Sequence, residues 1–324
     1  MLVELPAKLP IKLAKADREL VVKELCDIGY TTPEQCKSSL LLEYHRLRAF
    51  YAEEEGRRGR PPMQARDFFV HFQARGFLCF GYIYALIKND PKILLDTIYS
   101  YNRYNQVVYW DTGYDHGGFA WKVLIGYAGN DDTYIDFMLP RSLPLSDGRV
   151  VCHIATDCIL ALRNPELRDR AIDSAERFLG NKRTNNDRAT VSTLLSVLKD
   201  DGAAFSEGLQ KAVATHRQAK GSYQRGIGKL MPLFGYGMLA VAQRYLSAAE
   251  YARVDQPKHA LWWPDFVAYN EAQGYRPGQH LIEFAGELSF MNDAEAMMEV
   301  KHESAAEMRA EARRAYYASL KNSS

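Results

Sequence analysis

The sequence predicts an all-α protein made of stacked antiparallel helix pairs in an α-solenoid-like arrangement. Apolar residues recur at steps of three and four along most of the 324 residues, and strand patterns are scarce. Short breaks that contain Pro, Asn or Asp separate the expected helices, which favours antiparallel neighbours. The helix pairs repeat at roughly 35 to 40 residues, a period typical of helical repeats.

The first sixty residues are expected to form a separate helical module. A helix at Asp17–Ile28 is followed by Thr32, which can cap a second helix, and by Pro33, which suits a first helical turn. The basic segment Gly56–Pro62 is rich in Pro and Gly and predicts a linker. We therefore place a domain boundary after residue 60.

Residues 61–292 are expected to form the helical-repeat domain. Breaks such as Asn89-Asp90-Pro91 and Asn164-Pro165 divide it. The predicted helices of this domain are 64–89, 92–104, 116–127, 150–163, 166–179, 187–198 and 203–217.

A long apolar helix is expected after these pairs, at Ile227–Ala242, and a charged one at 293–324. The apolar helix contains Pro232 and several glycines, which predict a kink or close backbone packing. The C-terminal segment alternates acidic and basic residues and predicts an exposed helix with ion pairs along its surface.

Composition excludes several classes of partner. The 41 Lys and Arg residues nearly balance the 40 Asp and Glu residues, so no overall charge attracts nucleic acid. The most apolar stretch, Phe68–Ile87, contains charged and polar residues and is too polar to span a membrane. Five cysteines without a C-x-x-C pair suit a reducing compartment, and the N-terminus lacks the apolar core of a signal peptide. We expect a cytoplasmic protein.

No motif predicts a catalytic, cofactor or metal site. The stretch Gly221–Lys229 fails the phosphate-loop pattern because Ile227 stands after the second glycine of the pattern, where a Lys is required, and Leu230 follows Lys229 in place of Ser or Thr. His153 and Asp157, four residues apart, would share a helix face, but two ligands do not make a metal site, so we expect a structural role. No Gly-x-Ser-x-Gly elbow is present.

The segment Tyr99–Phe137 alternates aromatic and acidic residues. Tyr and Trp are enriched at binding hot spots, and acidic loops complement a basic partner. Alternatively, the aromatics fill the core and the aspartates cap helices. The predicted contact surface consists of Trp110, Asp111, Tyr114, Asp115, Asp131 and Asp132, and a second choice of Trp262, Trp263 and Asp265.

One constellation in this segment also permits an enzymatic alternative. Asp111 and Asp115 could act as paired carboxylates in general acid–base catalysis, with His116 beside them. Their separation in space decides whether such a hydrolase is possible.

Between roughly residues 64 and 270, paired helices that end in His216-Arg217 are followed by a Tyr-containing turn, a long helix with Gly237–Ala242, and Pro264 in an aromatic loop. This order of elements resembles immunity protein family 49 of bacterial polymorphic toxin systems.

The resemblance implies a cytoplasmic immunity protein. Such a protein binds a cognate toxin delivered by competing bacteria and blocks the active site of the toxin or access to its substrate, without chemistry or cofactor of its own. A helical-repeat scaffold and the hydrolase described above remain as alternatives.

Overall fold

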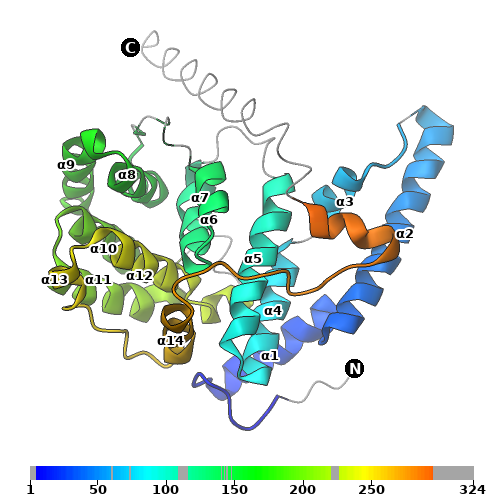
Figure 1. Ribbon diagram of the computed structural model, residues 1–324, viewed down its shortest axis with the longest axis horizontal. Helices are drawn as coiled ribbons and strands as arrows, with labels where there is room; N and C mark the ends of the chain where they lie inside the picture. The colour runs from blue at the N-terminus through cyan, green and yellow to red at the C-terminus, as the bar shows by residue number, and fades with distance from the viewer. Residues whose placement is uncertain are drawn as a thin grey trace.

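The computed structural model describes residues 5–59, 61–72, 74–108, 116–139, 141, 143, 145–146, 148–219 and 226–294. Helices account for the regular secondary structure of these residues, and no β-strand occurs among them (Figure 1). The all-α prediction is therefore confirmed.

The N-terminal helices are α1 (Lys15–Ile28), α2 (Pro33–Arg58) and α3 (Ala65–His71). The side chain of Thr32 caps α2 as predicted, because its hydroxyl oxygen accepts a hydrogen bond from the Gln35 N–H at 3.3 Å. The helix extends into the predicted linker and ends at Gly59, whose φ of 63° suits a residue without a Cβ atom.

The central helices are α4 (Ala74–Lys88), α5 (Pro91–Val108), α6 (His116–Ala128) and α7 (Asp132–Met138). The single helix predicted at 64–89 is two helices, α3 and α4, because Phe72 leaves the helical conformation. The ring of Phe72 stacks on that of Phe68, with 6.1 Å between the ring centres, and meets the ring of Tyr104 edge-on, with 5.5 Å between the centres. Aromatic packing in the core thus outweighs continuation of the helix.

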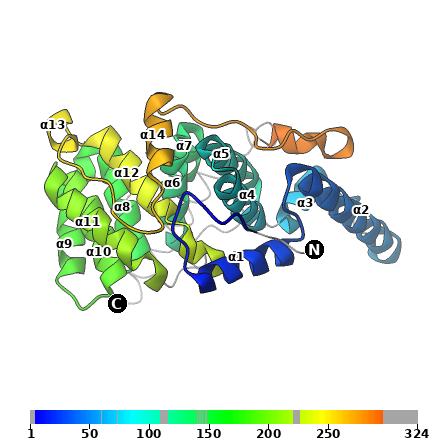
Figure 2. The ribbon, with the colours of Figure 1, turned by 90° about the horizontal axis from the view of Figure 1, so that it is seen from below.

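Four further helices lie side by side at one end of the molecule (Figures 1 and 2). They are α8 (Val151–Arg163), α9 (Arg168–Leu179), α10 (Asn185–Leu198) and α11 (Gly202–Thr215), with short 3-10 turns at Pro165–Leu167 and His216–Gln218. Their bounds agree with the predicted pairs. The next helix, α12 (Leu233–Tyr245), packs mainly on α6, so a regular solenoid series is not confirmed.

The predicted apolar helix at 227–242 is interrupted at Pro232. A 3-10 turn, Gly226–Leu230, precedes the proline and α12 follows it. A Cβ atom at Gly237 would lie 2.0 Å from the carbonyl oxygen of Leu124 in α6. Close backbone packing is therefore confirmed at Gly237, whereas the expected kink is a complete break between the 3-10 turn and α12.

The chain then returns across the molecule. After α13 (Ala248–Tyr251) and α14 (Pro264–Ala272), an extended segment at 276–285, here named the strap, crosses α5 and leads to the 3-10 helix η6 (Gly286–Asp293) (Figure 2). Side chains of α5 fix the strap, because the N–H of Gln279 donates to Asp96 and that of Leu281 to Ser100, at 2.9 and 2.8 Å.

A continuous hydrophobic core extends from Ile11 to Ala294. Contacts cross the boundary predicted after residue 60. The N–H of Lys12 donates to the Ala260 carbonyl at 2.8 Å, and Arg48 pairs with Glu287 at 2.5 Å. The division into domains stays a prediction, and most of the C-terminal segment 293–324 lies outside the described residues. Among the helices that the structure describes, none has the length and apolar character needed to cross a membrane.

Candidate functional site

Most of the first predicted contact surface lies outside the described residues. This applies to Trp110, Asp111, Tyr114 and Asp115. His116 begins α6, but its side chain is also outside the description. The aromatic–acidic contact surface and the hydrolase alternative therefore stay predictions at these positions.

Asp131 is a structural residue rather than a surface contact, which corrects the prediction. Its side chain is 1% exposed and accepts hydrogen bonds from Arg103 at 3.0 Å, Asn102 at 3.1 Å and the Tyr134 N–H at 3.1 Å. Burial raises the pKa of Asp131, against the lowering effect of the Arg103 guanidinium. The alternative that an aspartate here caps a helix is correct, because Asp131 is the N-cap of α7.

Asp132, the next residue, remains at the surface. Its side chain is 72% exposed and pairs with Arg244 of α12. It is the described member of the first predicted surface that a partner could contact.

The second predicted surface contains two buried tryptophans. Trp262 and Trp263 are 3% and 1% exposed. The ring of Trp262 lies 4.2 Å from that of Tyr236, whose hydroxyl accepts a hydrogen bond from the Trp263 N–H at 2.8 Å. Both tryptophans therefore belong to the core, which corrects their assignment as contacts. Asp265 is exposed in the first turn of α14.

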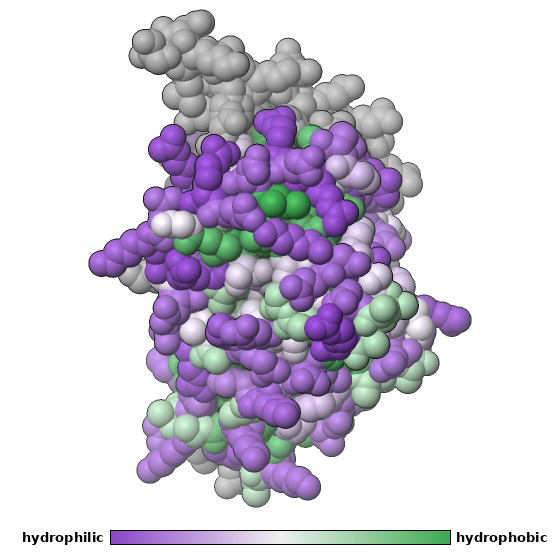
Figure 3. Space-filling view, turned by 90° about the vertical axis from the view of Figure 1, so that its left-hand side faces the viewer, coloured by the Kyte–Doolittle hydropathy of each residue, from purple (hydrophilic) through white to green (hydrophobic). Residues whose placement is uncertain are grey.

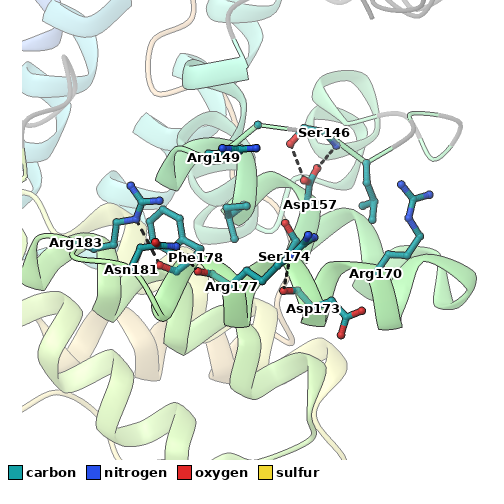
Figure 4. A pocket seen from close by; sticks show the side chains of 13 residues that line it. Ser146, Arg149, Asp157, Arg170, Asp173, Ser174, Arg177, Phe178, Asn181 and Arg183 are labelled. Carbon is teal, nitrogen blue, oxygen red and sulfur yellow. Dashed lines mark hydrogen bonds between the residues drawn. The ribbon is translucent and has the colours of Figure 1, made fainter. Parts of the chain in front are cut away.

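A cavity of about 490 Å³ lies between α8, α9 and the segment that precedes α8. Its volume is typical of ligand pockets. Figure 3 shows the end of the molecule formed by α8–α11, where hydrophilic side chains border an apolar strip. The residues that line the cavity are Leu145, Ser146, Gly148, Arg149, Ile154, Asp157, Arg170, Asp173, Ser174, Arg177, Phe178, Asn181 and Arg183 (Figure 4). We name it the arginine cavity after Arg149, Arg170, Arg177 and Arg183.

The four arginines come from three parts of the chain. Arg149 precedes α8, Arg170 and Arg177 belong to α9, and Arg183 follows α9. Within the described residues, none of the four forms an ion pair with a carboxylate. No carboxylate among the described residues therefore pairs directly with these guanidinium groups.

Local contacts orient two of these arginines. The Nε–H of Arg177 donates to the Asp173 carbonyl at 3.2 Å. The guanidinium of Arg183 lies 4.3 Å from the ring centre of Phe178, in a cation–π arrangement. Arg149 and Arg170 are exposed, and Figure 4 places them on different sides of the cavity.

Two carboxylates also line the cavity, and they offset only part of the charge of the four arginines. The carboxylate of Asp157 is buried and accepts hydrogen bonds from the N–H and the hydroxyl of Ser146, at 2.7 and 2.6 Å. Asp173 is exposed. Among the described residues that line the cavity, four guanidinium groups against two carboxylates leave an excess of positive charge.

The sequence pattern did not predict this cavity. It indicated only that His153 and Asp157 share one face of a helix. Among the described residues, no group of three or more ligands could hold a metal ion. The signal that was available is the spacing of Arg170 and Arg177, which are seven residues apart and so share one face of α9. Arg149 joins them only through the tertiary fold.

The chemistry of the arginine cavity is that of anion binding. Guanidinium groups stay charged at physiological pH and offer paired N–H donors that match the two oxygens of a carboxylate. Because guanidinium groups do not exchange protons at physiological pH, the four arginines can bind an anion but do not themselves supply an acid or a base. Comparisons with protein-family models, curated proteins and solved structures yield no match to this chain.

Proposed function

We propose that this chain is an immunity-type binding protein that neutralises a cognate protein toxin by holding an acidic element of the toxin in the arginine cavity. The observation that carries the proposal is the set of four arginines around one concave site, without carboxylate partners among the described residues. The resemblance of the sequence to an immunity protein family supports a toxin as the partner.

The charge of the cavity favours an acidic partner surface. This is opposite in sign to the basic partner expected from the acidic segment at 99–137. Arginine is among the residues most enriched at binding hot spots, where it forms paired hydrogen bonds that exclude water. Complementary charge also speeds association and selects against wrong partners.

Non-covalent neutralisation needs no catalytic group, cofactor or metal. In this proposal the protein acts in the cytoplasm, where the delivered toxin works. The scaffold alternative shares the same helical fold but has no toxin as a partner. The hydrolase alternative depends on Asp111, Asp115 and His116, whose side chains lie outside the described residues.

Co-expression with the product of the neighbouring upstream gene tests the proposal. The expected result is growth rescue and a stoichiometric complex in size-exclusion chromatography. The double charge reversal Arg170→Glu/Arg177→Glu should abolish both rescue and complex. The matched control Lys37→Glu/Arg46→Glu makes the same charge change on exposed positions of α2 and should keep both.

Two outcomes would overturn the proposal. Protection by the cavity variant at the wild-type level would show that the arginine cavity is not the contact site. Protection at far less than one molecule per toxin would indicate an enzyme, because a binding inhibitor acts by occupancy.

A further inference from the structure

Two side chains of α8 fix the segment that carries Arg149 into the arginine cavity. The carboxylate of Asp157 binds the N–H and the hydroxyl of Ser146, at 2.7 and 2.6 Å. The ring of His153 packs so closely on Gly148 that a Cβ atom there would lie 1.5 Å from Nδ1.

His153 and Asp157 are four residues apart and therefore point to the same side of the helix. Ser146 and Gly148 contact this side of α8, and Arg149 is the next residue in the chain after Gly148. Figure 4 shows Arg149 on the cavity wall beside the pair of Ser146 and Asp157.

We infer that Asp157 is a positioning residue that holds Arg149 in place for an anionic occupant. This inference rests on the proposed function of the arginine cavity. Asp157 is buried, so it acts on the occupant through the segment it holds. Two hydrogen bonds from one residue to one carboxyl group hold the short connecting segment against α8.

Fixing the backbone next to Arg149 has a direct effect on binding. A long exposed side chain loses conformational freedom when it pairs with a ligand, and a loose backbone adds to that loss. Because Ser146 uses both of its donors on Asp157, the Arg149 backbone is already ordered before an anion arrives. Preorganisation of this kind raises affinity without a new contact.

The test measures binding of a fluorescein-labelled decaglutamate peptide to the full chain by fluorescence anisotropy. Asp157→Ala removes both acceptors and should weaken binding about tenfold, by the loss of one positioned arginine. Asp157→Asn keeps an oxygen for the Ser146 N–H and should recover part of the affinity. Ser146→Ala removes a single bond and should act in the same direction, and it replaces Asp157→Ala if that variant does not fold.

A double-mutant cycle separates positioning from general damage. If Asp157 acts through Arg149, Asp157→Ala has no further effect in an Arg149→Ala background but keeps its full effect in an Arg170→Ala background. Equal effects of Asp157→Ala in the two backgrounds would show a merely structural role and would overturn the inference, while leaving the proposed function intact.

Trypsin cleavage after Arg149 provides an independent measurement. Asp157→Ala should speed cleavage there but not after Arg253, which is exposed and distant in the chain. Unchanged cleavage after Arg149 would overturn the inference even if the peptide binds. Failure of the wild-type chain to bind decaglutamate would instead count against the proposed acidic occupant, and the trypsin result would then decide the role of Asp157.

Discussion

Asp17 and Arg217, 200 residues apart in the chain, face each other through two parallel hydrogen bonds. Nη1 donates to Oδ1 and Nη2 to Oδ2, both at 2.8 Å. The same carboxylate accepts a hydrogen bond from the Ala14 N–H at 3.2 Å and so stabilises the start of α1. One side chain thus caps a helix and ties the N-terminal helix to the turn after α11. The Arg217 guanidinium holds the pKa of Asp17 below its usual value.

Removal of this pair should destabilise the protein. Arg217→Ala leaves the mostly buried carboxylate of Asp17 without its cation, and we expect a loss of about 1–2 kcal/mol in the free energy of unfolding by urea. Arg217→Lys should restore less than half of this lost stability, because a lysine cannot form both parallel hydrogen bonds to Asp17. The exposed pair Lys23–Asp27 is the control, and Lys23→Ala should leave the urea midpoint unchanged. Equal midpoints for Arg217→Ala and Lys23→Ala would contradict this prediction.

Stability should fall on mild acidification because of His216. Burial lowers the pKa of His216 to about 4 from 6.5, while its Nε2 lies 2.8 Å from the Gly228 carbonyl. As the pH falls below 6.5, His216 binds a proton in the unfolded chain but not yet in the folded chain. The contribution of neutral, buried His216 to the free energy of unfolding is therefore fully present above pH 6.5 and is lost as the pH falls towards 4.

Between pH 7.5 and 5.0 we expect the free energy of unfolding to fall by about 2 kcal/mol, because the pKa of His216 differs between the folded and the unfolded chain. Urea unfolding at the two pH values measures it. His216→Gln should remove most of this pH dependence. His259→Gln should remove less, because His259 is only partly buried. A His216→Gln protein with the same pH dependence as the wild type would refute the assignment to His216.

Two glycine-to-alanine substitutions should change stability in opposite directions. Gly237→Ala would place a methyl group 2.0 Å from the Leu124 carbonyl, and forced separation of α12 and α6 should cost at least about 2 kcal/mol. Gly56 lies in α2 with open space around it, so Gly56→Ala should stabilise by about 0.5 kcal/mol through helix propensity. Thermal unfolding of both variants provides the measurement, and a Gly237→Ala protein as stable as the wild type would disprove the close approach.

Trp263 should contribute to stability and not to partner binding. Trp263→Ala would leave a cavity in the core, with an expected cost of about 3–5 kcal/mol. Asp265→Ala, two residues away at an exposed position, is the matched control and should change little. Denaturant unfolding measures the cost. If Trp263→Ala keeps wild-type stability but loses binding to the partner, the original assignment of Trp263 as a contact would be restored.

Local signals predicted the helices well. Thr32 and Pro33 mark the start of α2, and Asn164 and Pro165 mark the break between α8 and α9, because caps and proline act within one turn of chain. The break at Phe72 was missed because its cause is the packing of Phe72 against Tyr104, a residue of another helix.

The site was harder to predict than the helices. Whether an acidic or aromatic residue is exposed depends on partners distant in sequence. Arg103 lies 28 residues from Asp131, and Tyr236 lies 27 residues from Trp263. No spacing rule connects such pairs. The arginine cavity likewise needs Arg149 and α9 together, and only the tertiary fold brings them to one place.

The strap has a consequence for the order in which the chain acquires its structure. It carries Phe290 to the opposite end of the molecule, where the ring meets Phe68 at 5.9 Å and Phe69 at 5.7 Å. During synthesis, α2 and α3 leave the ribosome long before this ring does. The aromatic core around α2 and α3 therefore stays incomplete until Phe290 has been synthesised.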